Sequence, residues 1–140
     1  MAFTATRTQV LEAARELLGV RFRHQGRDPQ TGVDCVGLLV VVGRALGYPN
    51  IVDVEGYRRT PSADTIRRTL ETNCDEIAPE DARDGDIWLM RLGGVKPRHV
   101  GFVNGSQILH ASAKGVRSED KSNFPASWFV AAFRLRGVVD

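Results

Sequence analysis

The sequence predicts an α+β fold, in which helices of the first half cover one face of an antiparallel sheet built by the second half. Apolar residues recur at helical spacing in the first half, whereas after residue 86 they fall in short β-rich runs with a period of two. Helices that precede a series of strands typically lie on one side of an antiparallel sheet. The chain has 140 residues, 42% of them hydrophobic and 26% charged, so we expect one globular domain over residues 1–140.

The first predicted helix begins after Thr6, which forms a plausible capping box with Gln9. Apolar residues then continue at helical spacing to Leu18, and Gly19 supplies a stop. Residues 20–33 are charged and interrupted by glycine and proline, which is typical of a loop.

The second predicted helix is the apolar stretch 35–46, with Asp34 as its N-cap and Gly47 after its end. Three consecutive valines favour a strand instead, but the two caps and the length of about three turns favour a buried helix. Residues 61–72 predict a short amphipathic helix, whereas residues 48–60 show no clear period.

Four strands are expected in the second half, at residues 87–92, 99–103, 107–112 and 129–135. Asn104-Gly105 is a dipeptide that a type I′ hairpin turn favours. With these two residues as the turn, His99 lies directly opposite His110 on one face of the sheet, with Cβ atoms about 5 Å apart.

Cys35 and Cys74 are the two cysteines, and neither belongs to a Cys-x-x-Cys pair. Cysteine attacks as the thiolate, which the positive end of a helix stabilises, and Cys35 lies in the first turn of the second predicted helix. We therefore expect Cys35 to be a nucleophile, His99 its general base and His110 the residue that orients the base. Cys74 is expected to be structural.

Four segments, in this order and spacing, resemble the NlpC-type, papain-like cell-wall cysteine peptidases: residues 32–38, 84–87, 99–102 and 108–112. The resemblance implies a papain-like fold with the nucleophile at the N-terminus of the core helix and a Cys-His-His triad. It also implies a γ-D-glutamyl or similar amide of peptidoglycan stem peptides as substrate, and no cofactor or metal.

Two residues depart from the family pattern. Val36 stands where the family commonly has a serine that helps to receive the substrate amine, and Phe22 stands where a tyrosine assists the oxyanion. His24 is either a solvated loop residue or a replacement oxyanion donor. Asp34 is a helix cap that we also consider for gripping the substrate amine, and Arg98 is either solvated or bound to a free carboxylate of the stem peptide.

The loop at residues 22–28 resembles the variant encoded with phage tails and gene-transfer particles. This resemblance implies phage-tail-like proteins as partners and incorporation in a tail-like particle after synthesis in the cytoplasm. We expect no signal peptide, because residues 1–9 contain no apolar segment.

Two other functions are open. Phe22 and Val36 favour a structural or assembly component of a tail that keeps the fold with little or no activity. A zinc site formed by Cys35, His99 and His110 is the third hypothesis, although short ligand spacing is missing. A net charge of +2 does not favour nucleic acid as a partner, and the longest apolar run, residues 38–42, is too short to span a membrane.

Overall fold

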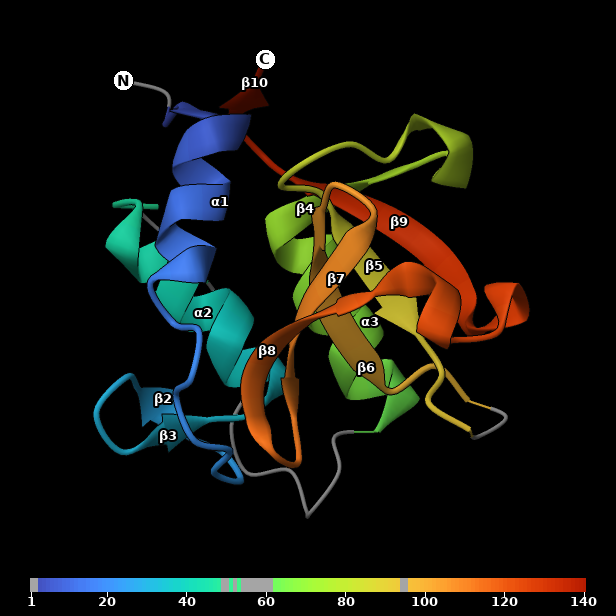
Figure 1. Ribbon diagram of the computed structural model, residues 1–140. Coiled ribbons are helices and arrows are strands. Elements are labelled where there is room, and N and C mark those ends of the chain that lie inside the picture. Colours follow the sequence, from blue (N-terminus) through green and yellow to red (C-terminus); the bar gives the residue numbers. More distant parts are fainter. Residues whose placement is uncertain (1–2, 49–50, 52, 54–61, 94–95) are drawn as a thin grey trace.

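The computed structural model describes residues 3–48, 51, 53, 62–93 and 96–140. Helices α1 (Arg7–Arg15) and α2 (Cys35–Ala45) pack on β6 and β7 of a six-stranded sheet, and α3 (Ala63–Asn73) packs beside β4 (Figure 1). All strand pairs of this sheet are antiparallel, so the predicted α+β fold is confirmed. The strands, in their spatial order, are β4 (Cys74–Ile77), β9 (Phe129–Leu135), β5 (Ile87–Met90), β6 (His99–Asn104), β7 (Gln107–Ser112) and β8 (Gly115–Asp120).

Short elements complete the described chain. β1 (Ala5–Thr6) pairs in parallel with β10 (Val138–Val139), and β2 (Arg27–Asp28) pairs with β3 (Gly32–Val33) in the predicted loop. Three single turns of 3₁₀ helix lie at Pro79–Asp81, Lys121–Asn123 and Ala126–Trp128.

The predicted helix caps are present. The Thr6 hydroxyl accepts from the Gln9 backbone N–H and the Gln9 side chain accepts from the Thr6 backbone, which completes the capping box of α1. This helix ends at Arg15 rather than Leu18, because the chain tightens into turns that lead to Gly19, whose φ is +89°. The third predicted helix is confirmed as α3, and most of residues 48–60 lie outside the described residues.

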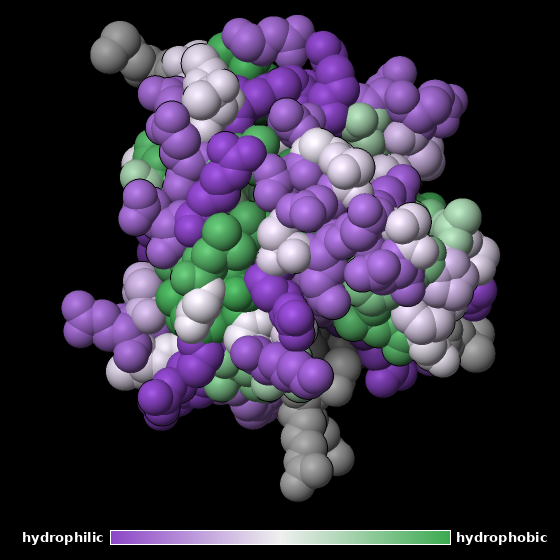
Figure 2. All heavy atoms as spheres, in the orientation of Figure 1, coloured by the Kyte–Doolittle hydropathy of each residue, from purple (hydrophilic) through white to green (hydrophobic). Residues whose placement is uncertain are grey.

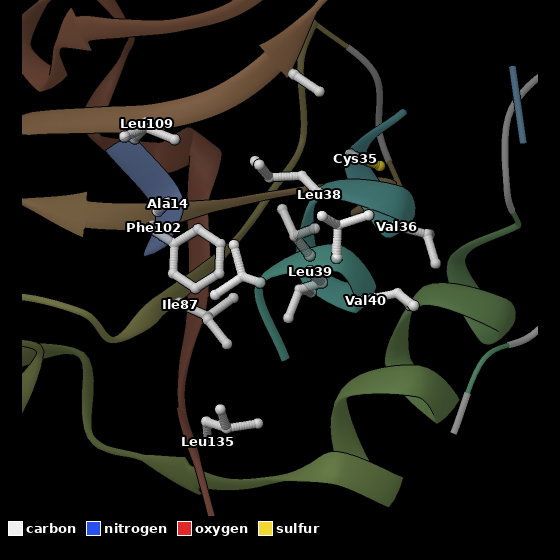
Figure 3. Packing of buried hydrophobic residues seen from close by; sticks show 14 of the residues in the cluster. Ala14, Cys35, Val36, Leu38, Leu39, Val40, Ile87, Phe102, Leu109 and Leu135 are labelled. Atoms are coloured by element: carbon white, nitrogen blue, oxygen red, sulfur yellow. The ribbon is translucent and has the colours of Figure 1, made fainter. Parts of the chain in front are cut away.

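Helix α2 is the centre of the core. The strand alternative for this stretch is wrong: Asp34 Oδ1 accepts the Gly37 backbone N–H at 2.8 Å, and every residue from Cys35 to Gly43 is buried. Its side chains meet Phe102 and Leu109 of the sheet (Figure 3). Burying such side chains stabilises the fold by about 1.5–3 kcal/mol each, so the start of α2 is held firmly against the sheet.

The four predicted strands are all present, but the register of the central hairpin differs from the prediction. Asn104 pairs with Gln107, so the turn residues are Gly105 and Ser106, and Gly101 rather than His99 lies opposite His110. Asn104 stays in the strand because its side chain donates to Ser118 and accepts from Arg15. Gly105 then supplies the positive φ, +61°, at the first turn position. The slip moves the partner of His99 by two residues, which keeps both histidines on one face.

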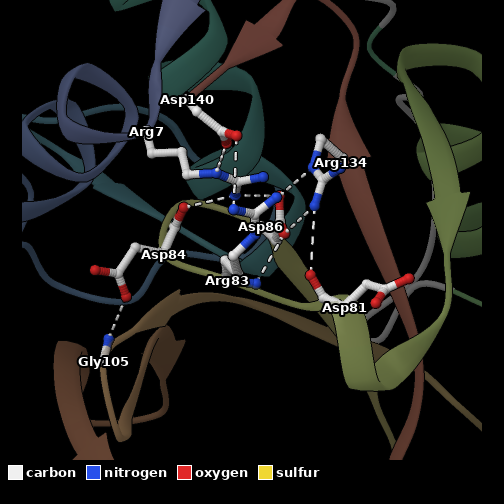
Figure 4. Close-up of polar contacts among 8 residues, drawn as sticks. All are labelled: Arg7, Asp81, Arg83, Asp84, Asp86, Gly105, Arg134 and Asp140. Carbon is white, nitrogen blue, oxygen red and sulfur yellow. Dashed lines mark hydrogen bonds and ion pairs between the residues drawn. The ribbon is translucent and has the colours of Figure 1, made fainter.

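A buried carboxylate explains the Gly-Asp motif before β5. Asp86 is fully buried, and its side chain binds Arg7 of α1 at 3.0 Å and both Nε and Nη2 of Arg134 of β9 at 3.0 Å (Figure 4). Its Oδ2 also accepts the Arg83 backbone N–H at 2.9 Å. Asp86 therefore connects the first helix to the sheet through charge-assisted hydrogen bonds.

The face shown in Figure 2 is mostly hydrophilic, with hydrophobic side chains gathered in a strip next to α1. Among the described residues, no helix combines the length and the apolar character that crossing a bilayer requires.

Candidate active site

Cys35 is the first residue of α2, and its sulfur lies against β6. The thiol Sγ is 4.0 Å from the Arg98 carbonyl oxygen, and the backbone of Val100 hydrogen bonds to the sulfur. These two contacts fall on either side of His99 in the strand. The register pairs of β6 and β7 end at Gly101, so the sulfur approaches Val100 just beyond the last pair of these two strands. The sulfur of Cys35 therefore lies against the backbone on both sides of His99.

The two histidines are joined directly. His99 Nε2 is 2.8 Å from His110 Nδ1, and the rings meet edge to face at an interplanar angle of 87°. The diagonal arrangement is close because Gly101, opposite His110, has no side chain: a Cβ there would lie 3.0 Å from His110 Cβ and 2.8 Å from an Ile108 side-chain carbon. Since Nε2 of His99 faces His110, Nδ1 is its ring nitrogen that remains for the thiol.

Glu119 extends this chain, and the sequence reasoning missed it. Its Oε2 lies 2.6 Å from His110 Nε2, on the neighbouring strand β8. Glu119 pairs with Ile108, two residues from His110 and on the same face of the sheet. Recognising residues 115–120 as a strand that follows a turn at residues 113–114 would have placed Glu119 beside His110.

Burial is the main cause of the shifted pKa values of Cys35 and His99. Burial, followed by the negative charge of Asp34, raises the pKa of the Cys35 thiol to about 12, although backbone hydrogen bonds from Val100 and Val36 oppose the rise. Burial, followed by the proximity of His110, lowers the pKa of His99 to about 3. The expected stabilisation of the thiolate at the helix start is outweighed in this conformation. The resting site therefore holds a neutral thiol beside a neutral imidazole.

Asp34 joins the loop before Cys35 to the helix that carries Cys35. Besides capping Gly37, its carboxylate accepts the Gln25 backbone N–H at 2.9 Å and pairs with Arg27 at 3.1 Å. Arg27 in turn binds both carboxylate oxygens of Asp53, at 3.0 and 2.9 Å. The capping role is confirmed. A role in binding a substrate amine stays a prediction, and it requires sharing a carboxylate that already has three protein donors.

The other predicted site residues lie at the surface around this loop and strand. Phe22 is 40% exposed and forms an isolated bridge to Val33, and its ring offers no hydrogen-bond donor to an oxyanion. His24 is exposed, with Nε2 3.3 Å from the Gln25 side-chain nitrogen. The Arg98 side chain is exposed, while its carbonyl faces the Cys35 sulfur. The oxyanion and substrate roles of these residues stay predictions.

The zinc hypothesis does not fit the histidine geometry. His99 and His110 direct ring nitrogens at each other, and the second nitrogen of His110 faces Glu119 rather than a shared position near Cys35. Within the described part of the chain, no group of three or more His, Cys, Asp or Glu residues is arranged to hold a metal ion.

Comparisons with solved structures agree with the fold. The NlpC/p60 domain of the peptidoglycan hydrolase SagA has a TM-score of 0.62 at 21% identity, covering 94% of this chain and 98% of that domain. A Staphylococcus aureus protein of the NLP/P60 family, described as similar to lipoprotein, has a TM-score of 0.65 at 20% identity; 96% of this chain is covered, but only 42% of that protein.

A third similar structure is RipD from Mycobacterium tuberculosis, described as a non-catalytic NlpC/p60 domain protein adapted to peptidoglycan binding. Its TM-score is 0.57 at 17% identity, with 93% of this chain and 95% of that chain covered. Among curated proteins the comparison found no match. At these identities the structural likeness establishes the fold alone.

Sequence comparison with family models covers most of the chain. The model of the NlpC/P60 family matches residues 19–134, a range that contains Cys35, both histidines of the pair and Glu119. The chain therefore belongs to the NlpC/P60 family.

Proposed function

We propose that this chain is a cysteine peptidase or amidase that hydrolyses an amide bond in bacterial peptidoglycan stem peptides. The observation that carries the proposal is the position of the Cys35 sulfur beside His99, whose second ring nitrogen is bound to His110. Nucleophile, base and orienting group in this relation form the arrangement that activates thiols. Family membership and the similarity to the peptidoglycan hydrolase SagA support the substrate class.

The reaction follows from the neutral resting site. As Sγ of Cys35 attacks the amide carbonyl, Nδ1 of His99 takes the thiol proton, so that the charge on each group develops only during the step. The backbone N–H of Cys35 and the positive end of α2 stabilise the oxyanion. His99 then protonates the leaving amine, which leaves an acyl-enzyme on Cys35. A water molecule that His99 deprotonates attacks this thioester, the bond from carbon to Sγ breaks, and His99 returns the proton to the sulfur as the product acid leaves.

The test is digestion of purified muropeptides, followed by mass spectrometry. We expect the wild type to release a stem-peptide fragment and Cys35→Ala to release none. Cys74→Ala is the matched control, because Cys74 is a buried thiol on β4 and is expected to leave cleavage unchanged. Cleavage by Cys35→Ala at the wild-type rate would show that another group is the nucleophile. Absence of cleavage by every form would remove the peptidase proposal for these substrates.

A second candidate function is peptidoglycan binding or tail assembly without turnover. The raised pKa of the Cys35 thiol favours it, together with Phe22 and Val36 at positions where the family has polar side chains. RipD gives a family precedent, since it is described as non-catalytic. Retention of the wild type on insoluble peptidoglycan, without release of fragments, is the result that selects this alternative.

We also propose that the protein is incorporated in a phage-tail-like particle, on the resemblance of residues 22–28 to the tail-associated variant. Tail-like particles purified from the organism that encodes the chain are expected to contain it when they are analysed by proteomics. Its recovery only as a free protein in the culture medium would contradict this assignment.

A further inference from the structure

A line of two short contacts leads from His99, next to Cys35, to a carboxylate at the surface. His99 Nε2 meets His110 Nδ1 at 2.8 Å, and His110 Nε2 meets Glu119 Oε2 at 2.6 Å. His110 is only 2% exposed and the Glu119 side chain 25%, so the carboxylate lies where the buried chain reaches solvent. The donor and the acceptor in each of these two hydrogen bonds depend on which ring nitrogen of each histidine carries the proton.

The carboxylate determines that direction. An ionised carboxylate only accepts hydrogen bonds, so Nε2 of His110 must carry a proton to bind Glu119. A neutral imidazole has one N–H, and Nδ1 of His110 therefore accepts from Nε2–H of His99. His99 then has its lone pair on Nδ1, the nitrogen that faces away from His110.

The opposite direction would remove the base. If Nδ1 of His110 carried its proton, it would donate to Nε2 of His99, and His99 would carry its own proton on Nδ1. That tautomer presents a donor to the thiol and cannot accept the thiol proton. The two histidines alone do not determine the direction of the hydrogen bond, since a pair of neutral imidazoles is compatible with both directions.

The surroundings hold the chain in place. Phe124 packs edge to face on the His110 ring, with the centroids 5.9 Å apart and an interplanar angle of 87°. Glu119 is held by the β7–β8 register, in which it pairs with Ile108 and Arg117 pairs with His110. The ring and the carboxylate therefore meet through fixed backbone positions on neighbouring strands.

We infer that Glu119 is a positioning residue, whose carboxylate fixes the Nε2–H tautomer of His110 and, through it, the Nε2–H tautomer of His99, so that Nδ1 of His99 is the base for Cys35. The inference rests on the proposed function for its catalytic consequence, but the tautomers themselves can be observed without substrate. Glu119 also adjoins the proton path, so that the imidazolium formed during attack is bonded through His110 to a negative charge.

The experiment is long-range ¹H–¹⁵N spectroscopy of protein labelled at its histidines at neutral pH. The chain contains three histidines, so loss of signals in His24→Gln, His99→Gln and His110→Gln assigns the rings. In the wild type, His99 and His110 are both expected as Nε2–H tautomers. In Glu119→Gln, whose amide both donates and accepts, each of the two rings is expected to show a mixture of tautomers. Glu80→Gln, at an exposed glutamate, is the matched control and should retain the wild-type spectrum.

Two results would overturn the inference. The first is an Nδ1–H tautomer of His99 in the wild type, which needs no variant and so does not depend on how a variant folds. The second is an unchanged, single Nε2–H tautomer at both rings in folded Glu119→Gln.

On a cleaved muropeptide, Glu119→Gln should lower kcat about 10- to 100-fold and leave KM unchanged. A raised KM with unchanged kcat would contradict a positioning role. If no form cleaves, the spectra still decide the tautomers, so failure of the peptidase proposal and failure of this inference are distinguishable.

Discussion

Acid should destabilise this protein through His99, and the size of the effect follows from its burial. Burial, followed by the proximity of His110, lowers the pKa of His99 from 6.5 to about 3. Below pH 6.5 the unfolded chain therefore binds a proton that the folded site excludes, so this contribution to stability is present above pH 6.5 and is lost as the pH falls toward 3. At about 1.4 kcal/mol per pH unit for one proton, the loss between pH 7 and pH 5 is about 2 kcal/mol.

The measurement is urea unfolding, followed by tryptophan fluorescence, at pH 7, 6 and 5. The difference in unfolding free energy between wild type and His99→Gln should change by about 2 kcal/mol over this range, because the variant lacks the excluded proton. His24→Gln, at an exposed histidine, should keep the wild-type slope. Parallel curves for wild type and His99→Gln would refute the reasoning, since His99 would then titrate alike in the folded and unfolded chain.

Three further predictions follow from the same site. The logarithm of the Cys35 alkylation rate, measured in Cys74→Ala, should rise steadily from pH 6 to 9, whereas a plateau would indicate a preformed thiolate. The free energy of unfolding should fall above pH 9 by about 1.4 kcal/mol per pH unit for each thiol, because burial raises the pKa of both Cys35 and Cys74 to about 12. In urea unfolding, Cys74→Ala should halve this slope, and an unchanged slope would contradict the prediction. Asp34→Asn should keep the helix cap but lose about 2–4 kcal/mol in urea unfolding, because Gln25 N–H and Arg27 lose their buried carboxylate; a loss below about 0.5 kcal/mol would contradict the described network.

The parts of the fold that sequence reasoning predicted are those with local signals. Helix α2 has a capping aspartate and an apolar run that exceeds the length of a strand, and β7 and β9 have clear β composition, so their bounds were predicted closely. Strands β4 and β8 were missed because they form the two edges of the sheet. Their sequences are rich in polar residues and show no alternation of apolar and polar side chains.

In the candidate site, too, the residues with a local sequence signal were predicted and those that depend on tertiary packing were not. Cys35 and the histidine pair were predicted from the residues and the family resemblance. The two histidines are still in contact although the register differs from the predicted one, because a shift of two residues leaves both side chains on the same face of the sheet. Glu119 was missed together with the strand that carries it. The raised pKa of Cys35 was also missed, since the helix start is visible in the sequence but the surrounding burial is a product of tertiary packing.

The most direct test of the account is to trap the covalent intermediate. A stem peptide is mixed with enzyme, the reaction is stopped with acid during turnover, and the intact protein is weighed by mass spectrometry. We expect an added mass equal to the acyl part of the peptide, located on Cys35, present in Cys74→Ala and missing in Cys35→Ala. Turnover without any adduct, and retained by Cys35→Ala, would contradict the claim that the sulfur at the start of α2 performs the attack.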